Sequence, residues 1–130
     1  MILLRQSIVW ILLPLLALLA AGCATWEGAR LYQSGSEALE RGDTDDALRD
    51  LTAAAALVPE ASEIHNHLGL AQLQAGEPEQ ALRSFERAVQ LDCDNRAASE
   101  NLARTERRLA LEATRRVLAP ELPREKGDAP

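Results

Sequence analysis

The fold is decided by residues 62–95, which read SEIHNHLGLAQLQAGEPEQALRSFERAVQLDCDN. Residues 28–61 read GARLYQSGSEALERGDTDDALRDLTAAAALVPEA and repeat the same pattern 34 positions earlier. Small residues in one copy correspond to small residues in the other, and large apolar residues correspond to large apolar ones. A fixed period of this length indicates an array of structural repeats, in which each copy is one supersecondary unit.

Each copy has the pattern of a helical hairpin. In the second copy, one face of the first predicted helix carries the apolar residues Ile64, Leu68, Ala71 and Ala75. Gly76 suits the end of that helix because glycine enters the left-handed region without penalty. Pro78 suits the first turn of the next helix, where its missing N–H costs nothing. Gly69 and Ala81 allow close helix approach, and the hairpin must stack on a neighbour to bury its apolar face.

The pattern resembles the tetratricopeptide repeat. The matching positions are Leu68, Gly69, Ala81, Phe85 and Ala88 in the second copy, and Leu31, Gly35, Ala47, Leu51, Ala54 and Pro59 in the first. The copies depart from the family pattern at His65, Gln72, Cys93, Ser34 and Ala38. The resemblance implies an all-α fold, a short TPR-type α-solenoid that binds peptides on the inner face of each first helix. The alternative is an ordinary helical bundle with an accidental period.

The repeat boundaries predict the organisation of the chain. Residues 28–61 form the first repeat, with helices over Glu27–Arg41 and Asp43–Leu57, and residues 62–95 form the second. A long helix over residues 96–118 caps the last hairpin, because the repeat pattern fades there and no glycine turn follows. The prolines and glycine of residues 119–130 predict a disordered tail.

The start of the chain has the composition of a targeting segment. Residues 1–22 contain an apolar run and end in small residues, so we exclude them from the fold. The string Leu19-Ala20-Ala21-Gly22-Cys23 resembles a bacterial lipobox. This implies diacylation of Cys23, stable lipid anchoring through a tether over residues 23–27, and an outer-membrane destination facing the periplasm. An ordinary cleaved signal peptide and an uncleaved anchor are the alternatives.

Composition and charge limit the function classes. Apolar residues make up 47% of the chain and aromatic ones 3%, which predicts closely packed helices with a core of alanine and leucine. A net charge of −6 argues against a general nucleic-acid role, which requires a basic surface. The charge is unequally divided, with a net −9 over residues 24–95 and +3 over residues 96–126. The basic helix is either a solvated face or a contact for anionic lipid, peptidoglycan or an acidic partner.

No group of residues has the pattern of a catalytic site, so we expect no enzyme activity and no cofactor. The acidic run over residues 43–46 suits a helix start and lacks the glycine and distal glutamate of a calcium loop. His65 and His67 point roughly 200° apart on a helix, so we expect no metal site there. Cys93 lies in the predicted turn before the last helix, where we expect a structural, partly buried residue rather than pairing between chains.

The predicted function lies in the groove that the resemblance implies. Carried over by repeat position, the partner-binding residues are Tyr32, Ser36, Asn66, Leu70, Leu73, Asn101 and Arg104, with Leu39 and Glu63 beside them. We expect a membrane-tethered adaptor that binds a peptide or helix of a protein partner in this groove. The alternative is a self-associating structural protein, a homo-oligomer that stacks through its repeat ends.

Overall fold

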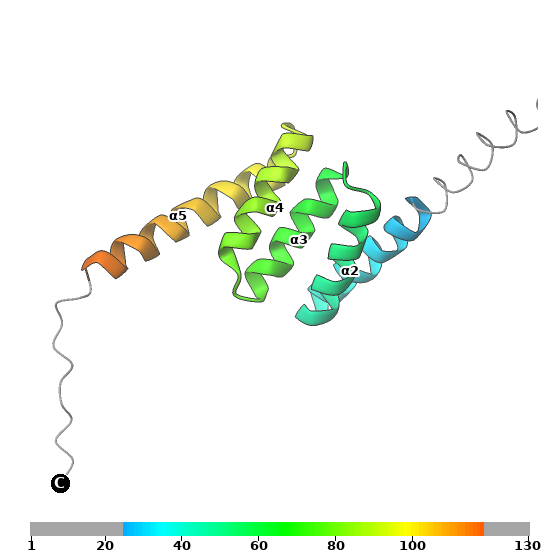
Figure 1. The fold of residues 1–130 in the computed structure, drawn as a ribbon, viewed down its shortest axis with the longest axis horizontal. Helices are drawn as coiled ribbons and strands as arrows, with labels where there is room; N and C mark the ends of the chain where they lie inside the picture. The colour runs from blue at the N-terminus through cyan, green and yellow to red at the C-terminus, as the bar shows by residue number, and fades with distance from the viewer. Residues whose placement is uncertain (1–24, 119–130) are drawn as a thin grey trace, which may run out of the picture.

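The computed structural model describes residues 25–118, which contain helices and no strand. A first helix covers residues 25–41, and it is followed by α2 (Thr44–Leu57), α3 (Ser62–Gln74), α4 (Pro78–Leu91) and α5 (Arg96–Leu118). Successive helices lie side by side in chain order, and α5 packs on α4 and α3 before it extends beyond them (Figure 1). The described chain is therefore a short all-α solenoid, as predicted. None of its described helices combines the length and apolar character needed to cross a bilayer.

The turns inside the two hairpins have the same geometry. Gly42 and Gly76 have φ angles of 83° and 79°, in the left-handed region that favours glycine. In each turn the N–H after the glycine donates to the carbonyl five residues back, at 2.9 Å in the first hairpin and 2.8 Å in the second. In each turn the glycine N–H also donates to the carbonyl three residues back, at 3.2 Å and 3.1 Å respectively, and the two bonds together form a Schellman motif. The glycine and Pro78 signals of the second copy are confirmed, because Pro78 opens α4.

The start of α2 differs from its prediction in one detail. The helix begins at Thr44, and Asp43 stands at the N-cap without a side-chain capping bond. Its carboxylate instead accepts a hydrogen bond from Nε of Arg41 at 3.0 Å. The acidic residues therefore act on the helix through the dipole, while Asp43 is committed to a neighbouring arginine.

The core repeats the same contact in each hairpin. Leu51 in α2 and Phe85 in α4 are 34 residues apart, and both are fully buried. Gly35 lies against Leu51 and Gly69 against Phe85, so that a Cβ atom built on either glycine falls 2.7 Å and 2.5 Å from those side chains. In each hairpin, a glycine on the first helix leaves room for a large side chain from the second helix. The close helix approach that we expected at Gly69 is thus confirmed.

The last helix continues the repeat register. Asn95 caps α5, since its Oδ1 accepts the N–H of Ala98 at 3.0 Å, and its Nδ2 donates to Oγ of Ser62 at 2.8 Å. Ala98 and Thr105 face the core at 0% and 2% exposure. They stand 34 residues after Ile64 and Ala71, which are the corresponding buried positions of α3. The packed half of α5 therefore occupies the place of the first helix of a third hairpin.

The remaining predictions concern the two ends of the described region. Residues 25–27, which we expected in an extended tether, belong to the first helix. The targeting segment, Cys23 and the predicted tail over residues 119–130 lie outside the described residues.

Candidate partner-binding groove

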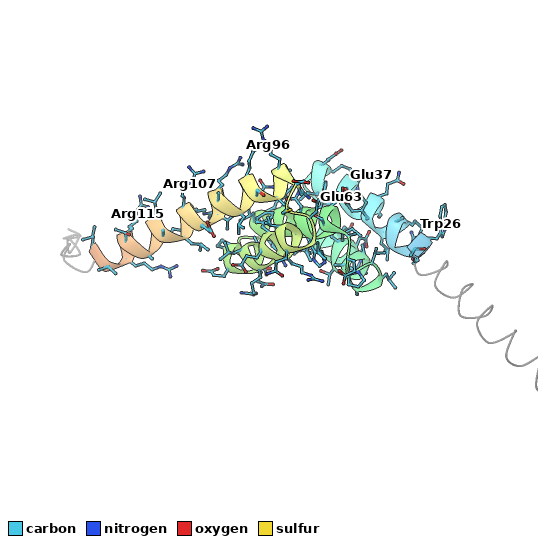
Figure 2. All side chains as sticks on the ribbon, turned by 90° about the horizontal axis from the view of Figure 1, so that it is seen from above. Trp26, Glu37, Glu63, Arg96, Arg107 and Arg115 are labelled. Atoms are coloured by element: carbon cyan, nitrogen blue, oxygen red, sulfur yellow. The ribbon has the colours of Figure 1, made fainter. Side chains whose placement is uncertain are left out.

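The candidate groove residues come from the first helix, α3 and α5. In Figure 2 the first helix and α5 lie toward the same edge of the molecule, and Glu63, near the start of α3, lies between them. The alternation of hairpin helices explains this placement. Each first helix is followed by a second helix that packs behind it, so every other helix faces the same side.

Tyr32 joins the first helix to α3. Its hydroxyl lies 3.3 Å from Nδ1 of His67, and the two rings meet edge to face with centroids 5.1 Å apart. Nδ1 of His67 also lies 3.0 Å from the carbonyl oxygen of Glu63 in its own helix. Tyr32 is therefore a half-buried part of the contact between the hairpins, with its ring edge committed to the histidine.

Asn66 joins α3 to α5 in the same way. Nδ2 of Asn101 donates to Oδ1 of Asn66 at 2.9 Å. Asn66 is only 6% exposed, so it holds α5 in place and does not present a free amide to a partner. The prediction that Asn66 contacts a partner directly is therefore corrected. Asn101 stays half-buried at the surface of this contact.

These two contacts are one contact repeated. Tyr32 and Asn66 are 34 residues apart, as are His67 and Asn101, so each bond joins a position in one repeat to the next position in the following repeat. Both bonds span 35 residues. We call this pair of bonds the cross-repeat ladder. It fixes the first helix, α3 and α5 in one row. These bonds were not predicted from the sequence, although pairing residues 35 positions apart, one more than the repeat length, would have indicated them.

The remaining candidate residues differ in accessibility. Leu70 and Leu73 on α3 are half-buried, and Leu39 packs against the core cluster around Leu51. Ser36 is half-buried with its Oγ enclosed, and that atom makes no hydrogen bond within the described residues. Arg104 is exposed on α5. The candidate groove residues therefore offer partly accessible apolar area on α3 and positive charge on α5.

A second polar contact holds the first hairpin together. The hydroxyl of Ser34 donates to Oδ2 of Asp50 at 2.6 Å, and Nε of Arg49 donates to Oδ1 at 3.0 Å. The Ser34 hydrogen bond lowers the pKa of the Asp50 carboxyl more than burial raises it, and Arg49 lowers it further. Asp50 is thus an ionised residue at only 7% exposure, and Ser34, a departure from the family pattern, is its partner.

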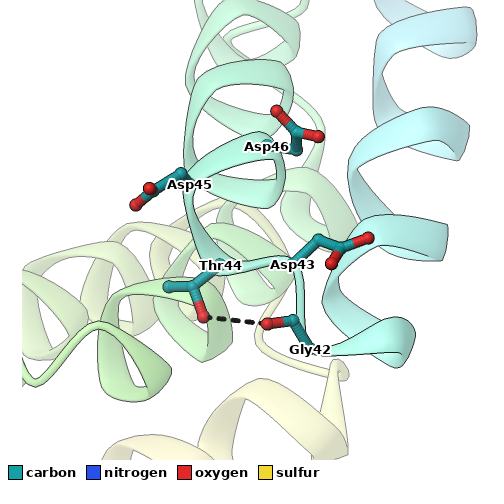
Figure 3. Close-up of a pocket in the computed structure, with 5 residues that line it drawn as sticks. All are labelled: Gly42, Asp43, Thr44, Asp45 and Asp46. Carbon is teal, nitrogen blue, oxygen red and sulfur yellow. Dashed lines mark hydrogen bonds between the residues drawn. The ribbon is translucent and has the colours of Figure 1, made fainter.

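The turn over residues 42–46 forms an open hollow of about 480 Å³ (Figure 3). The side chains of Asp43, Asp45 and Asp46 point in different directions in Figure 3, and Asp46 is paired with Arg49 at 2.6 Å. Within residues 25–118, no three histidine, cysteine or acidic side chains are placed to hold a metal ion. We assign no ligand to this hollow.

Two further sequence predictions concern histidine and cysteine. Nε2 of His65 lies 3.0 Å from the carbonyl oxygen of Pro59, and His67 is part of the ladder, so each histidine has a hydrogen-bonding neighbour. Cys93 is a free thiol in the turn before α5 and is exposed. The expectation that it is partly buried is wrong, and the side chains that hold this turn are those of Asp92 and Asn95.

Comparison with known proteins supports the repeat register. A family model described as Tetratricopeptide repeat matches residues 32–96 and also residues 68–113. The two matched segments together reach from the first helix into α5 and cover more than half of the chain. The second match carries the repeat pattern into α5, which agrees with the place of Asn101 in the cross-repeat ladder. A search of curated proteins found none that matches this chain.

Proposed function

Because the chain belongs to the tetratricopeptide repeat family, we propose that it is an adaptor that binds a segment of a protein partner across the first helix, α3 and α5. The main support is the cross-repeat ladder, which keeps these three helices in one row. Preorganised helices reduce the ordering cost of binding. Repeats of this family typically serve as protein–protein interaction scaffolds, and our proposal for this chain is likewise a non-catalytic role.

The partner segment we propose is an extended peptide or a helix with a few apolar anchors. Leu70 and Leu73 remain half-buried, and each therefore has apolar area left to bury against a partner. Glu63 is exposed on α3 and Arg104 is exposed on α5. Charges at the rim of an apolar contact favour a correctly oriented segment over a reversed one.

In-cell photo-cross-linking tests this proposal. A photoreactive amino acid at Leu73 should capture one dominant partner, and Leu70→Glu should abolish the capture because it places a charge in the apolar contact. Thr52→Glu is the matched control, since Thr52 is exposed on α2. Thermal unfolding followed by circular dichroism establishes that both variants are folded. Capture that survives Leu70→Glu in a folded protein would show that the groove is not the binding surface.

We also propose that the adaptor is anchored at the cell envelope through lipid on Cys23, facing the periplasm from the outer membrane. The support is the lipobox-like string before Cys23, which is a property of the sequence. Cys23→Ser should remove incorporation of an alkyne-labelled palmitate and release the protein from the membrane fraction. A variant that keeps both the label and the membrane location would refute acylation at Cys23.

The alternative role, self-association through the repeat ends, has one observation against it. The exposed surface of α5 carries Arg96, Glu100, Arg104 and Arg107 around an open hollow. A charged outer face is what a capping helix needs to keep a repeat array soluble. We therefore expect a constant monomer mass in light scattering across a wide concentration range. A mass that rises with concentration would favour stacking.

A further inference from the structure

The far end of α5 leaves the body of the molecule. Thr105, at 2% exposure, is the last buried residue of this helix. The residues after it extend for about 20 Å at a rise of roughly 1.5 Å each. Leu111, Val117 and Leu118 are 71%, 75% and 74% exposed there, and Figure 1 shows this part of the helix projecting beyond α4. We call residues 104–118 the arm.

The arm is basic, whereas the body is acidic. It contains five arginines and two glutamates, and the part of the described chain before α5 carries a net −9. Nε of Arg108 donates to Oε1 of Glu112 at 2.9 Å, so one of the two glutamates is already neutralised. The arm extends farther than the screening length of about 10 Å at 0.1 M salt. Its tip therefore presents positive charge that the acidic body does not cancel.

Two arginines and two leucines of the arm share one face. Arg107, Leu111 and Arg115 follow each other at four-residue spacing, and Leu118 comes one heptad after Leu111. In Figure 2, Arg107 and Arg115 point to the same side of α5, away from the body. Leucine side chains are therefore flanked by guanidinium groups on the face that has no protein against it in the described chain.

The charge of this face of the arm, and the spacing of its leucines, indicate which kind of partner it binds. A second copy of the arm is disfavoured, because pairing two arms would bring like charges together. A partner helix needs a continuous apolar ridge, and Thr114 and Arg115 interrupt the one between Leu111 and Leu118. An anionic lipid surface needs neither a ridge nor shape complementarity. It accepts separated leucines at the depth of the headgroups and holds the flanking arginines by charge.

We propose that the arm binds the surface of a bilayer that contains anionic lipid, with Leu111 and Leu118 at the interface and Arg107 and Arg115 on the headgroups. None of these four residues is a candidate groove residue, and the lipid proposed on Cys23 belongs to the other end of the chain. An adaptor held at both ends lies along the membrane instead of extending from it.

Hydrogen exchange measured by mass spectrometry tests the arm locally. The full-length chain is mixed with vesicles of phosphatidylcholine alone or with about one third phosphatidylglycerol. We expect exchange within residues 106–118 to slow at least fivefold with phosphatidylglycerol and to recover at high salt, because screening weakens the attraction. Any contribution of the N-terminal segment is outside this readout. Equal exchange with the two vesicles would overturn the proposal.

Two variants and two probes complete the test. Arg107→Glu with Arg115→Glu should abolish the slowing, and Leu111→Ser with Leu118→Ser should reduce it severalfold. Arg83→Glu, an exposed arginine on α4, should leave it unchanged. Slowing by polyglutamate without any effect of phosphatidylglycerol would assign the arm to an acidic protein. Slowing that depends only on protein concentration would assign it to a second copy. Either result would refute the lipid surface.

Discussion

Replacing Gly69 by alanine tests the packing of the second hairpin. The added Cβ falls 2.5 Å from Cε1 of Phe85 and 2.8 Å from Cδ1 and Cζ, and Phe85 is fully buried. Overpacking of this kind costs about 1–3 kcal/mol. Alanine also gains about 1 kcal/mol over glycine in a helix interior. The net expectation is a destabilisation of about 1 kcal/mol, because the ring has no free space into which to move.

The assay is thermal and urea unfolding of the variant. A net loss of about 1 kcal/mol corresponds to a fall in Tm of about 4–8 °C for a domain of this size. Ala103→Gly, at an exposed position of α5, measures the alanine–glycine difference without a packing contribution. We expect this control to cost about 1 kcal/mol, so the Gly69→Ala result can be corrected for helix propensity.

A double-mutant cycle identifies the cause. Leucine has no atoms equivalent to Cε1 and Cζ of Phe85 and keeps a counterpart only of Cδ1, so Phe85→Leu relieves most of the contact that the new methyl group would violate. Gly69→Ala should become neutral or stabilising in that background, with a coupling of about 1–2 kcal/mol between the sites. If Gly69→Ala stabilises the wild-type background, or costs the same in both backgrounds, the close approach to Phe85 is not the reason for glycine.

Three other predictions concern polar contacts. Ser34→Ala should cost about 1.5–3 kcal/mol in urea unfolding at neutral pH, because a hydrogen bond to the ionised Asp50 is lost. The pKa of Asp50 is lowered in the folded state, so its contribution to folding stability is complete above the ordinary carboxyl pKa of 3.8 and is lost as the pH falls through the folded pKa. The difference in unfolding free energy between the wild type and Ser34→Ala should therefore shrink on acidification below pH 3.8. A difference that stays constant with pH would contradict this assignment. Asn101→Ala should lower the free energy of unfolding by about 1–3 kcal/mol, because it leaves the buried Oδ1 of Asn66 without its hydrogen-bond donor. Tyr32→Phe removes a longer, half-buried contact and should lower it less. Equal losses of stability in the two variants would refute this ranking.

The sequence predicts the parts of this fold that depend on local chemistry. Gly76 and Pro78 end one helix and start the next because of their own backbone preferences, so their roles can be recognised without a structure. The pairing of Gly69 with a large residue follows from the period, which brings the same small and large positions together in each hairpin.

The parts that depend on contacts between repeats were harder to predict. Asn66 has the position of a groove residue, but its burial depends on Asn101 in another helix. Gln72 stands where the family prefers an aromatic residue, and in the structure its Oε1 accepts a hydrogen bond from the buried hydroxyl of Ser84 at 2.7 Å. Cys93 is exposed, in a turn held by the side chains of Asp92 and Asn95. For Asn66 and Gln72, a partner distant in sequence decides the environment of the residue.

The place of α5 makes the length of this protein adjustable. α5 contacts α3 through a hydrogen bond between residues 35 positions apart, and α3 contacts the first helix through a bond of the same spacing. The capping helix can therefore pack on any hairpin that carries the α3 residue of this contact. A copy of residues 62–95 inserted before Arg96 would keep Asn95 and Asn101 in their present surroundings. Longer arrays can therefore arise by duplication of one segment, with the same capping helix closing the array.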